Sequence, residues 1–508
     1  MLSKINTATI RGIEAVQVTV ETDLGRGMPA MNVVGLVDTT IKEAKERIRT
    51  AILNSGCQFP SGRLTINMAP ADIRKRGSHL DLPMAMGILL GSRQILGADI
   101  DEYCFMGELS LDGSVNKVTG VLPMVNAMAK NGVQKFVVPF ENREEAALVR
   151  GVEIYPASTL TEIITHFNLK KRIDSMEAVA EMSCGAVNES SGPDFADVKG
   201  QEYAKRAITV AVAGGHGMVM TGSPSTGKTM LAERIPTIMP DMTYEEILEA
   251  SIIYSVAGLL DEDRPFISER PFRRPHHKIT AAGLIGGGAY PRPGEITLAS
   301  GGVLFLDEFG EFDRNLIDTL RQPLEEKRIC ITRLGDTYVY PADFLMVAAT
   351  NPCKCGYYGD PDHECRCTAR DVEMYRSRIS GPIMDRIDMH LKLIPVRYRE
   401  LTGGTVTSSA EMRERVSGAR RRQKIRLAGT GLELNSQMND HTTDALVELD
   451  IESRRLLEQA YGTLKLNPRT LLKVKKMSRT IADLDGCDTV GVQHVAEALQ
   501  YREQGAAE

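Results

Sequence analysis

The sequence has no long hydrophobic run. A membrane-spanning helix needs about 18 or more consecutive apolar residues, and no such stretch occurs in the chain. The opening segment, MLSKINTATIRGIEAV, also lacks the apolar centre of a secretory signal. We therefore expect a cytoplasmic protein that makes no membrane contact.

A strong excess of one charge is also missing. The 61 Lys and Arg residues are slightly outnumbered by 67 Asp and Glu residues, so the net charge is −6. This balance excludes a uniformly basic nucleic-acid-binding protein, although local basic patches could still contact phosphates.

The chain has 508 residues, which is too long for one hydrophobic core and predicts about two to four domains.

Cysteine is scarce outside one segment. Five of the nine cysteines are scattered, at positions 57, 104, 184, 330 and 487. This distribution fits a reducing cytoplasm, where a tight cysteine cluster indicates a metal more often than disulfides. The other four crowd into the segment NPCKCGYYGDPDHECRC as Cys353, Cys355, Cys365 and Cys367.

Hydrophobic patterns divide the chain into folded regions. Residues 1–167 predict an α/β or α+β domain, and residues 168–194 lack apolar periodicity and predict a linker. A second α/β region follows over 195–395, and 396–508 is helical and basic. The strand-like runs of the first region are IEAVQVTVET, RLTINMAP, YCFMGELSL, KFVVP and VEIYP. Its helical segments are TTIKEAKERIRTAILNSG, LDLPMAMGILLGS and TGVLPMVNAMAKNG.

The segment GMVMTGSPSTGKTMLAERI contains a phosphate-binding pattern. It satisfies G-x-x-x-x-G-K-[ST] between an apolar strand and a helix, which is the context the pattern requires. Backbone N–H groups of such a loop surround phosphate oxygens, while its lysine reaches the β- and γ-phosphates and its hydroxyl binds Mg²⁺. The predicted ATP-binding residues are Gly222, Ser223, Pro224, Ser225, Thr226, Gly227, Lys228 and Thr229.

Two further buried strands end in polar residues. GGVLFLDEF ends in Asp307, which would hold Mg²⁺ with Thr229, and in Glu308, which would polarise the attacking water. FLMVAATN ends in Asn351, whose amide could orient that water. On its own the strand ending in Asp307 and Glu308 would also fit a core strand capped by solvated acids, but the phosphate loop upstream favours the catalytic interpretation.

This order of parts resembles the AAA+ ATPases. The resemblance gives Asn351 the role of sensor 1. In the segment ISGPIMDRIDMHL it makes Arg386 an arginine finger that reaches a neighbouring subunit, and in LNPRTLLKVKKMSRT it makes Arg469 the sensor 2 residue.

The strings PFRRPHH, GGG, PRPGEI and NPCKCGYYG together resemble the ComM/YifB group of magnesium-chelatase-like AAA+ proteins over nearly the whole chain. The resemblance implies an α/β fold class with three parts. These are an N-terminal Lon-protease-like domain (ribosomal S5 domain 2-like), a P-loop AAA+ core with a parallel sheet, and a C-terminal helical lid. It also implies a homo-hexameric, ATP-driven DNA motor that moves branched DNA during natural transformation.

Protease chemistry is not expected from the N-terminal domain. Aligned with the Lon serine–lysine dyad, this sequence has His79 at the serine position and apolar Leu122 near the lysine position. A hydroxyl nucleophile needs a base within hydrogen-bond reach. A shifted pairing of Ser78 with Lys117 remains an alternative.

Basic residues form one candidate DNA contact. The string FRRPHHK lies between helix-breaking prolines and predicts an exposed loop suited to phosphate contact without sequence readout. From charge alone a solvated loop is the alternative, whereas the family resemblance favours DNA contact. Arg333 beside a predicted hairpin tip at Gly335-Asp336 is a second candidate. The loop residues in question are Arg273, Arg274, His276, His277 and Lys278.

The four clustered cysteines predict a closed structural Zn²⁺ site. Their spacing departs from C-x-x-C, so reduced thiols and redox-active disulfides remain alternatives.

Overall the sequence predicts an ATP-hydrolysing ring motor that acts on single-stranded or branched DNA, with ATP, Mg²⁺ and Zn²⁺ as cofactors. The alternatives are a chelatase-like factor that remodels a protein or loads a metal, and an ATP-dependent protease.

Overall fold

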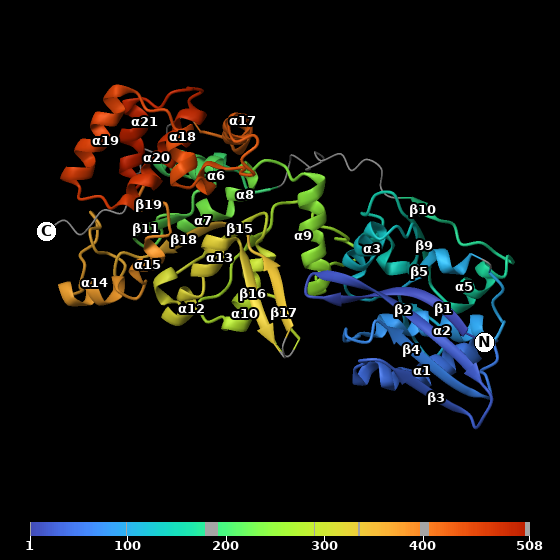
Figure 1. The fold of residues 1–508 in the computed structure, drawn as a ribbon. Coiled ribbons are helices and arrows are strands. Elements are labelled where there is room, and N and C mark those ends of the chain that lie inside the picture. The colour runs from blue at the N-terminus through green and yellow to red at the C-terminus, as the bar shows by residue number, and fades with distance from the viewer. Residues whose placement is uncertain are drawn as a thin grey trace.

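The structure is a computed structural model, in which residues 2–97, 99–177, 192–288, 290–333, 336–396 and 406–502 are described. An N-terminal α/β lobe lies at one end of the molecule, and a central α/β lobe carries the C-terminal helices on its far side (Figure 1). In the described ranges, no helix is both long and apolar enough to cross a bilayer. The α/β class and the helical C-terminal region agree with the sequence prediction.

An eight-stranded mixed sheet forms the N-terminal lobe, in the order β10-β9-β8-β5-β1-β2-β4-β3. Its strands are β1 (Leu2–Arg11), β2 (Glu14–Gly25), β3 (Ala30–Val34), β4 (Arg63–Ala69), β5 (Tyr103–Phe105), β8 (Lys135–Pro139), β9 (Glu153–Ala157) and β10 (Met176–Glu177). The predicted strands are present, except that YCFMGELSL divides into β5 and the short β6 (Glu108–Leu109), which pairs with β7 (Val115–Asn116). Strand β10, from the stretch predicted as linker, pairs with β9, and residues 178–191 of that stretch lie outside the described residues.

The helices of this lobe are α1 (Thr39–Asn54), α2 (Asp81–Gly91), α3 (Val121–Lys130), α4 (Arg143–Ala146) and α5 (Leu160–Phe167). The three helical segments predicted from sequence correspond to α1, α2 and α3. Asp38 caps α1 by accepting a hydrogen bond from the backbone N–H of Ile41 at 3.1 Å. Helix α2 is buried along almost its whole length, which explains its continuous apolar sequence.

A five-stranded parallel sheet, β12-β15-β18-β11-β19, forms the central lobe. Its strands are β11 (Met218–Gly222), β12 (Phe272–Arg273), β15 (Val303–Leu306), β18 (Leu345–Thr350) and β19 (Met389–Leu393). Strands β15 and β18 are buried throughout, because helices cover both faces of a parallel sheet. The carboxyl ends of parallel strands meet at one edge, which is where ligands bind in such folds.

Shorter elements surround this sheet. Its helices are α6 (Glu202–Gly214), α7 (Lys228–Glu233), α8 (Ile235–Ile238), α9 (Tyr244–Ala257), α10 (Ala281–Ile285), α11 (Glu295–Leu298), α12 (Arg314–Asp318), α13 (Arg321–Glu326), α14 (Ala369–Arg376) and α15 (Gly381–Met384). Two antiparallel pairs are inserted, β13 (Gly286–Gly287) with β14 (Arg292–Pro293) and β16 (Arg328–Arg333) with β17 (Asp336–Pro341). The second is the predicted hairpin, of which residues 334–335 lie outside the described part. The C-terminal helices are α17 (Ser409–Arg426), α18 (Asp440–Leu446), α19 (Ile451–Thr463), α20 (Pro468–Leu484) and α21 (Val492–Gln500).

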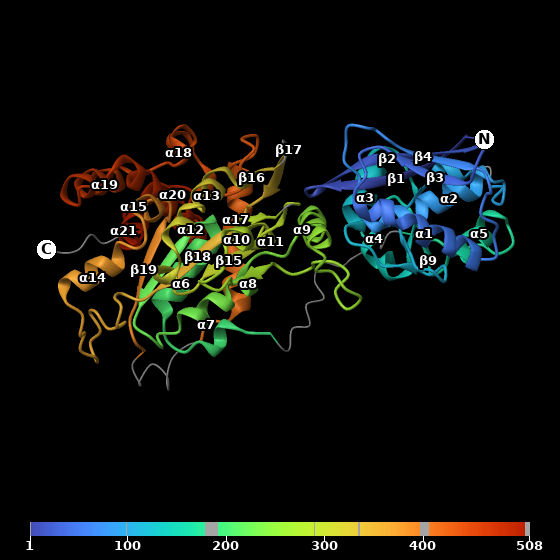
Figure 2. The same cartoon turned by 90° about the horizontal axis from the view of Figure 1, so that it is seen from below.

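Helix α9 joins the two lobes. It lies between them in both views (Figures 1 and 2). Its buried residues Ile247 and Ile253 belong to one hydrophobic cluster with Val121 and Met124 of α3. At the same boundary the Lys117 amine donates a hydrogen bond to the carbonyl of Leu260 at 2.9 Å. The lobes therefore share a continuous core.

Candidate nucleotide-binding site

The phosphate loop connects β11 with α7 at the carboxyl edge of the central sheet. Gly227 has a φ of 84°, a left-handed conformation that glycine adopts without strain. The half-buried Lys228 amine donates to the carbonyls of Gly222 at 2.7 Å and Ser223 at 2.8 Å. It also donates to the side-chain oxygen of Asn351 at 3.2 Å. Burial lowers the pKa of Lys228.

The predicted acids lie beside this loop because β15 and β11 flank β18 in the sheet. The Thr229 hydroxyl donates to a carboxylate oxygen of Asp307 at 3.1 Å. Glu308 follows with a φ of 53°, and its side chain is 57% exposed. The structure therefore brings together Lys228, Thr229, Asp307 and Asn351, as the sequence predicted, and leaves the Glu308 carboxylate accessible to solvent.

The basic loop after β12 lies against these acids. Arg274 is paired with Asp307 at 2.6 Å and with Glu233 at 3.3 Å. His277 contacts Glu308 with 3.0 Å between ring nitrogen and carboxylate oxygen. The loop predicted to contact DNA is thus bound to the nucleotide site.

Of the other residues predicted to contact DNA, some are bound within the protein and others are exposed to solvent. Arg273 belongs to β12 rather than to a free loop, and it binds Glu295 through two hydrogen bonds at 2.6 and 2.7 Å. The ring of His276 lies 4.2 Å from that of His277. Lys278 and the hairpin residue Arg333 are exposed. A DNA role for all six residues remains a prediction.

The two other predicted arginines bind one carboxylate. Arg386, after α15, contacts Glu325 of α13 at 2.7 Å, and Arg469 of α20 contacts the same oxygen at 2.9 Å. The side chain of Arg386 is 16% exposed, whereas that of Arg469 is 48% exposed. The hydrogen bond from Arg386, together with that from Arg469, lowers the pKa of Glu325.

The four clustered cysteines converge. Their sulfur atoms all lie within 4.8 Å of one another. Three Sγ–Sγ distances, for the pairs 353–355, 355–365 and 353–365, are 3.3, 3.5 and 3.7 Å. Four sulfurs arranged tetrahedrally around Zn²⁺ at about 2.3 Å would be about 3.8 Å apart. These residues therefore fit a tetrathiolate metal centre and are too far apart for disulfides.

A cavity of about 550 Å³ adjoins the phosphate loop. One wall is formed by Pro224 and the following loop residues, and another by Gln201 and its neighbours before α6. The third wall comes from the cysteine segment, which contributes Tyr357, Asp360 and His363. The sequence does not indicate this wall, because GYYGDPD alone predicts only turns.

At the positions aligned with the Lon dyad, the described part of the N-terminal lobe has two buried side chains. The His79 ring is buried and lies 3.0 Å from the carbonyl oxygen of Ala8, and burial lowers the pKa of His79 to about 4. Leu122 is buried in α3. Lys117 is bound to Leu260 at the lobe boundary, so its amine is occupied away from the alternative pairing with Ser78.

Comparisons with known proteins agree with this architecture. Residues 194–401 match the family "Magnesium chelatase, subunit ChlI", residues 20–142 match "Subunit ChlI of Mg-chelatase", and residues 406–502 match its C-terminal region. YifB of Escherichia coli, which is described as uncharacterized, is 38% identical over 99% of this chain and 97% of its own length. Competence protein ComM of Haemophilus influenzae is 38% identical over 97% of this chain and 95% of its own length.

A more distant likeness covers only part of the chain. Lon protease 2 of Bacillus subtilis is 30% identical over 125 residues, which are 24% of this chain and 22% of that protein. The near-complete matches, in contrast, extend over both lobes and the C-terminal helices. The chain belongs to the ComM/YifB family of magnesium-chelatase-like AAA+ proteins.

Proposed function

We propose that the protein is an ATP-hydrolysing motor that acts on DNA as a homo-hexameric ring in the cytoplasm. The ATPase part of this proposal rests on one observation. Four side chains lie together at one edge of a parallel sheet, namely Lys228, Thr229, Asp307 and Asn351. Such an edge, with a lysine, a hydroxyl and a carboxylate in contact, has the groups that phosphoryl transfer from ATP requires.

Each residue of the site has a distinct task in this proposal. Lys228 neutralises the β- and γ-phosphates, and Asn351 holds the lysine and orients the attacking water. Asp307 and Thr229 supply the hard oxygen donors that suit Mg²⁺, which would neutralise charge on the phosphates. The exposed Glu308 carboxylate polarises the water once it is released from His277.

Two arginines complete the site from a neighbouring subunit. Arg386 acts as the finger, and Arg469 as the sensor 2 residue. Since both bind the same oxygen of Glu325 in the isolated chain, we assign them to one subunit interface, where a γ-phosphate would replace the carboxylate as their shared anion.

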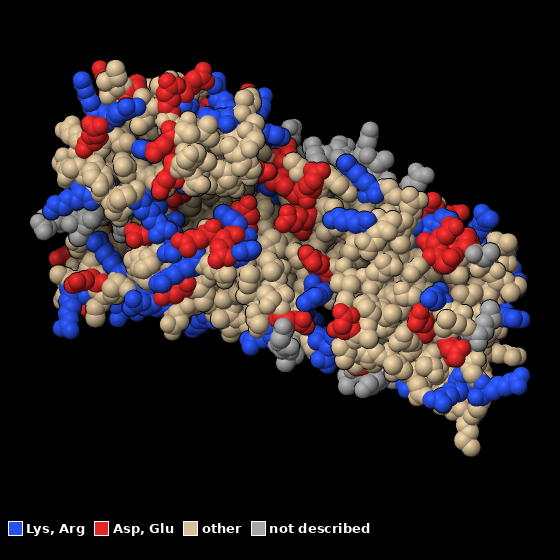
Figure 3. Space-filling view, in the orientation of Figure 1, with Lys and Arg blue, Asp and Glu red and all other residues tan. Residues whose placement is uncertain are grey.

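Support for DNA as the substrate comes from the relatives and from the two basic segments. The competence protein ComM is similar over 97% of the chain, and the DNA replication licensing factor mcm7 of Schizosaccharomyces pombe is 22% identical over 67% of it. Basic and acidic groups are interspersed on the face drawn in Figure 3. DNA contact is assigned to two local sites, the loop Arg273–Lys278 and the hairpin residue Arg333.

The ATPase rate with and without single-stranded, duplex and forked DNA tests the proposal. We expect Mg²⁺-dependent hydrolysis that DNA stimulates, and we expect Glu308→Gln to bind ATP but lose about 10²-fold or more of the rate. Hydrolysis that responds to a protein partner but to none of the DNAs would instead favour the chelatase-like alternative. Hydrolysis at the parental rate by Glu308→Gln would refute the role given to Glu308.

We also propose that Cys353, Cys355, Cys365 and Cys367 hold a structural Zn²⁺. The converging sulfur atoms support this proposal, and a site with four protein ligands has no open position for catalysis. A zinc content of about one ion per chain would agree with it.

A further inference from the structure

The cysteine segment is attached directly to the phosphate loop. At Gly356, with a φ of 89°, an added Cβ would lie 2.8 Å from two ring atoms of Pro224. The nearby Ser223 hydroxyl is the first of the influences that lower the pKa of Asp360 to about 2. The Asp360 side chain is only 1% exposed. The segment therefore contacts two consecutive residues of the loop that binds phosphates.

The same segment has little structure of its own. Between Cys353 and Cys367 it contains only turns, bends and irregular backbone. Of its side chains, Cys353 is buried, whereas most others are exposed or half-buried. Ordering such a stretch costs conformational entropy that no local hydrophobic core offsets. A metal ion held by its two ends would supply this ordering.

The segment also forms one wall of the cavity beside the phosphate loop. Tyr357 and His363 line the cavity, and their ring centroids lie 4.8 Å apart at an interplanar angle of 30°. Because the cavity adjoins the phosphate loop, a nucleoside whose triphosphate occupied that loop would have this space beside it. Paired aromatic rings offer a flat, polarizable surface against which a purine can pack.

The geometry points to a metal-dependent nucleotide pocket: Zn²⁺ bound by Cys353, Cys355, Cys365 and Cys367 holds the Tyr357–His363 wall against Ser223 and Pro224, and this wall binds the purine of ATP. Metal loss releases the wall and weakens nucleotide binding, although every residue of the phosphate loop is retained. This inference rests on the proposed function for the identity of the ligand as ATP.

The experiment measures zinc content and mant-ATP affinity on the same full-length protein. Zinc is removed with a thiol-reactive mercurial and a chelator, the thiols are restored with reductant, and the protein is divided into a metal-free half and a zinc-reloaded half. We expect the metal-free half to bind mant-ATP about tenfold or more weakly and the reloaded half to recover. Circular dichroism checks that the remainder of the fold persists.

Four variants distinguish the effect of losing the metal from the effect of changing the cavity wall. Cys365→Ser should lose zinc and nucleotide affinity together, whereas Cys330→Ser, an exposed cysteine on β16, should lose neither. Asp360→Asn should keep zinc but bind mant-ATP less tightly, because the charged partner of Ser223 is gone. Glu364→Gln, at an exposed position of the same segment, should leave both unchanged.

The outcomes distinguish this inference from the proposed function. Equal mant-ATP affinity in the metal-free and reloaded halves would overturn the inference and leave the ATPase assignment intact. Protein that neither contains nor takes up zinc would overturn it as well. Failure of fully zinc-loaded protein to bind mant-ATP would instead overturn the proposed function on which the inference rests.

Discussion

At the scale of single residues, Arg274 changes how the basic loop must be understood. Its guanidinium group pairs with Asp307 at 2.6 Å, the carboxylate that the proposed mechanism assigns to Mg²⁺. One carboxylate oxygen cannot serve both partners equally well, so arginine and metal compete. A substitution in this loop therefore affects the nucleotide site directly, in addition to any effect on DNA.

We expect Arg274→Ala to lower the Mg²⁺ concentration needed for half-maximal mant-ATP binding. The change should be about two- to fivefold, since a partly exposed ion pair contributes up to about 1 kcal/mol. Lys278→Ala provides the control, because this cation belongs to the same loop and is exposed. An identical Mg²⁺ dependence in Arg274→Ala and the parent protein would show that the ion pair does not compete with the metal.

The predicted residues that the structure brings together share one property. Lys228, Thr229, Asp307 and Asn351 belong to local patterns whose spacing reflects a backbone shape, and the cysteines carry their chemistry in their side chains. Glu325 and Asp360 have no such pattern. Their importance depends on partners that only the fold brings close. Glu325 lies beside Arg386 and Arg469, and Asp360 lies beside Ser223.

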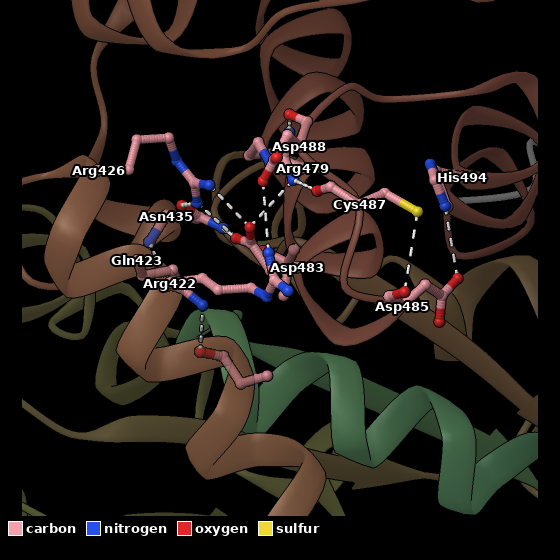
Figure 4. Close-up of polar contacts among 12 residues, drawn as sticks. Arg422, Gln423, Arg426, Asn435, Arg479, Asp483, Asp485, Cys487, Asp488 and His494 are labelled. Atoms are coloured by element: carbon pink, nitrogen blue, oxygen red, sulfur yellow. Dashed lines mark hydrogen bonds and ion pairs between the residues drawn. The ribbon is translucent and has the colours of Figure 1, made fainter.

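At the scale of secondary-structure elements, a buried carboxylate connects the C-terminal helices. Asp483 of α20 accepts hydrogen bonds from Arg426 of α17, from Arg479 one turn earlier, and from Asn435 (Figure 4). Its side chain is fully buried, and that of Arg479 is 1% exposed. The network is linked to the central lobe, because the ring of His216 lies 2.8 Å from the Thr480 hydroxyl, to which Asn435 also donates.

Asp483→Asn should lower the free energy of unfolding by about 3–5 kcal/mol, because it leaves the buried Arg479 and the half-buried Arg426 without their charged partner. Chemical denaturation followed by circular dichroism measures this change. Asp488→Asn is the matched control, since the Asp488 side chain is 99% exposed where it meets Arg422. If both variants unfolded at the same denaturant concentration as the parent, the network would not hold the helices together.

Whether a segment forms a helix or a strand was easier to predict than which other element it packs or pairs with. The buried strands β15 and β18 were predicted because both faces of a parallel sheet are covered, which produces continuous apolar runs. Strand β1 was not predicted, because its sequence, LSKINTATIR, intersperses polar residues among the apolar ones. Strand β10 has only two residues, and its pairing with β9 cannot be inferred from so short a segment.

At the scale of the whole molecule, the sequence did not reveal how the lobes are joined. Helix α9 has apolar residues on several faces, and such a pattern does not indicate which surface covers the helix. In the structure its residues Ile247 and Ile253 share a core with α3 of the other lobe. Which surface covers an apolar helix is a property of the assembled chain and leaves no trace in local periodicity.

The arrangement of Arg386 leads to a test of assembly. An arginine supplied to a neighbour's γ-phosphate neutralises charge that develops in the transition state, and such fingers contribute roughly 10³–10⁵ in rate. Arg386→Ala should therefore bind ATP nearly normally and hydrolyse it poorly. The exposed Arg370→Ala on α14 should retain parental activity and serves as the control.

Mixing two inactive proteins decides whether the finger acts between subunits. Lys228→Ala keeps Arg386 but has a defective phosphate loop, whereas Arg386→Ala has an intact loop without the finger. When subunits exchange, some interfaces in the mixture pair an intact loop with an intact finger, so hydrolysis should reappear. Exchange is verified independently by energy transfer between labelled subunits. If Arg386 acted within its own chain, no interface in the mixture would be complete, and an exchanged mixture that stayed inactive would exclude the proposed ring mechanism.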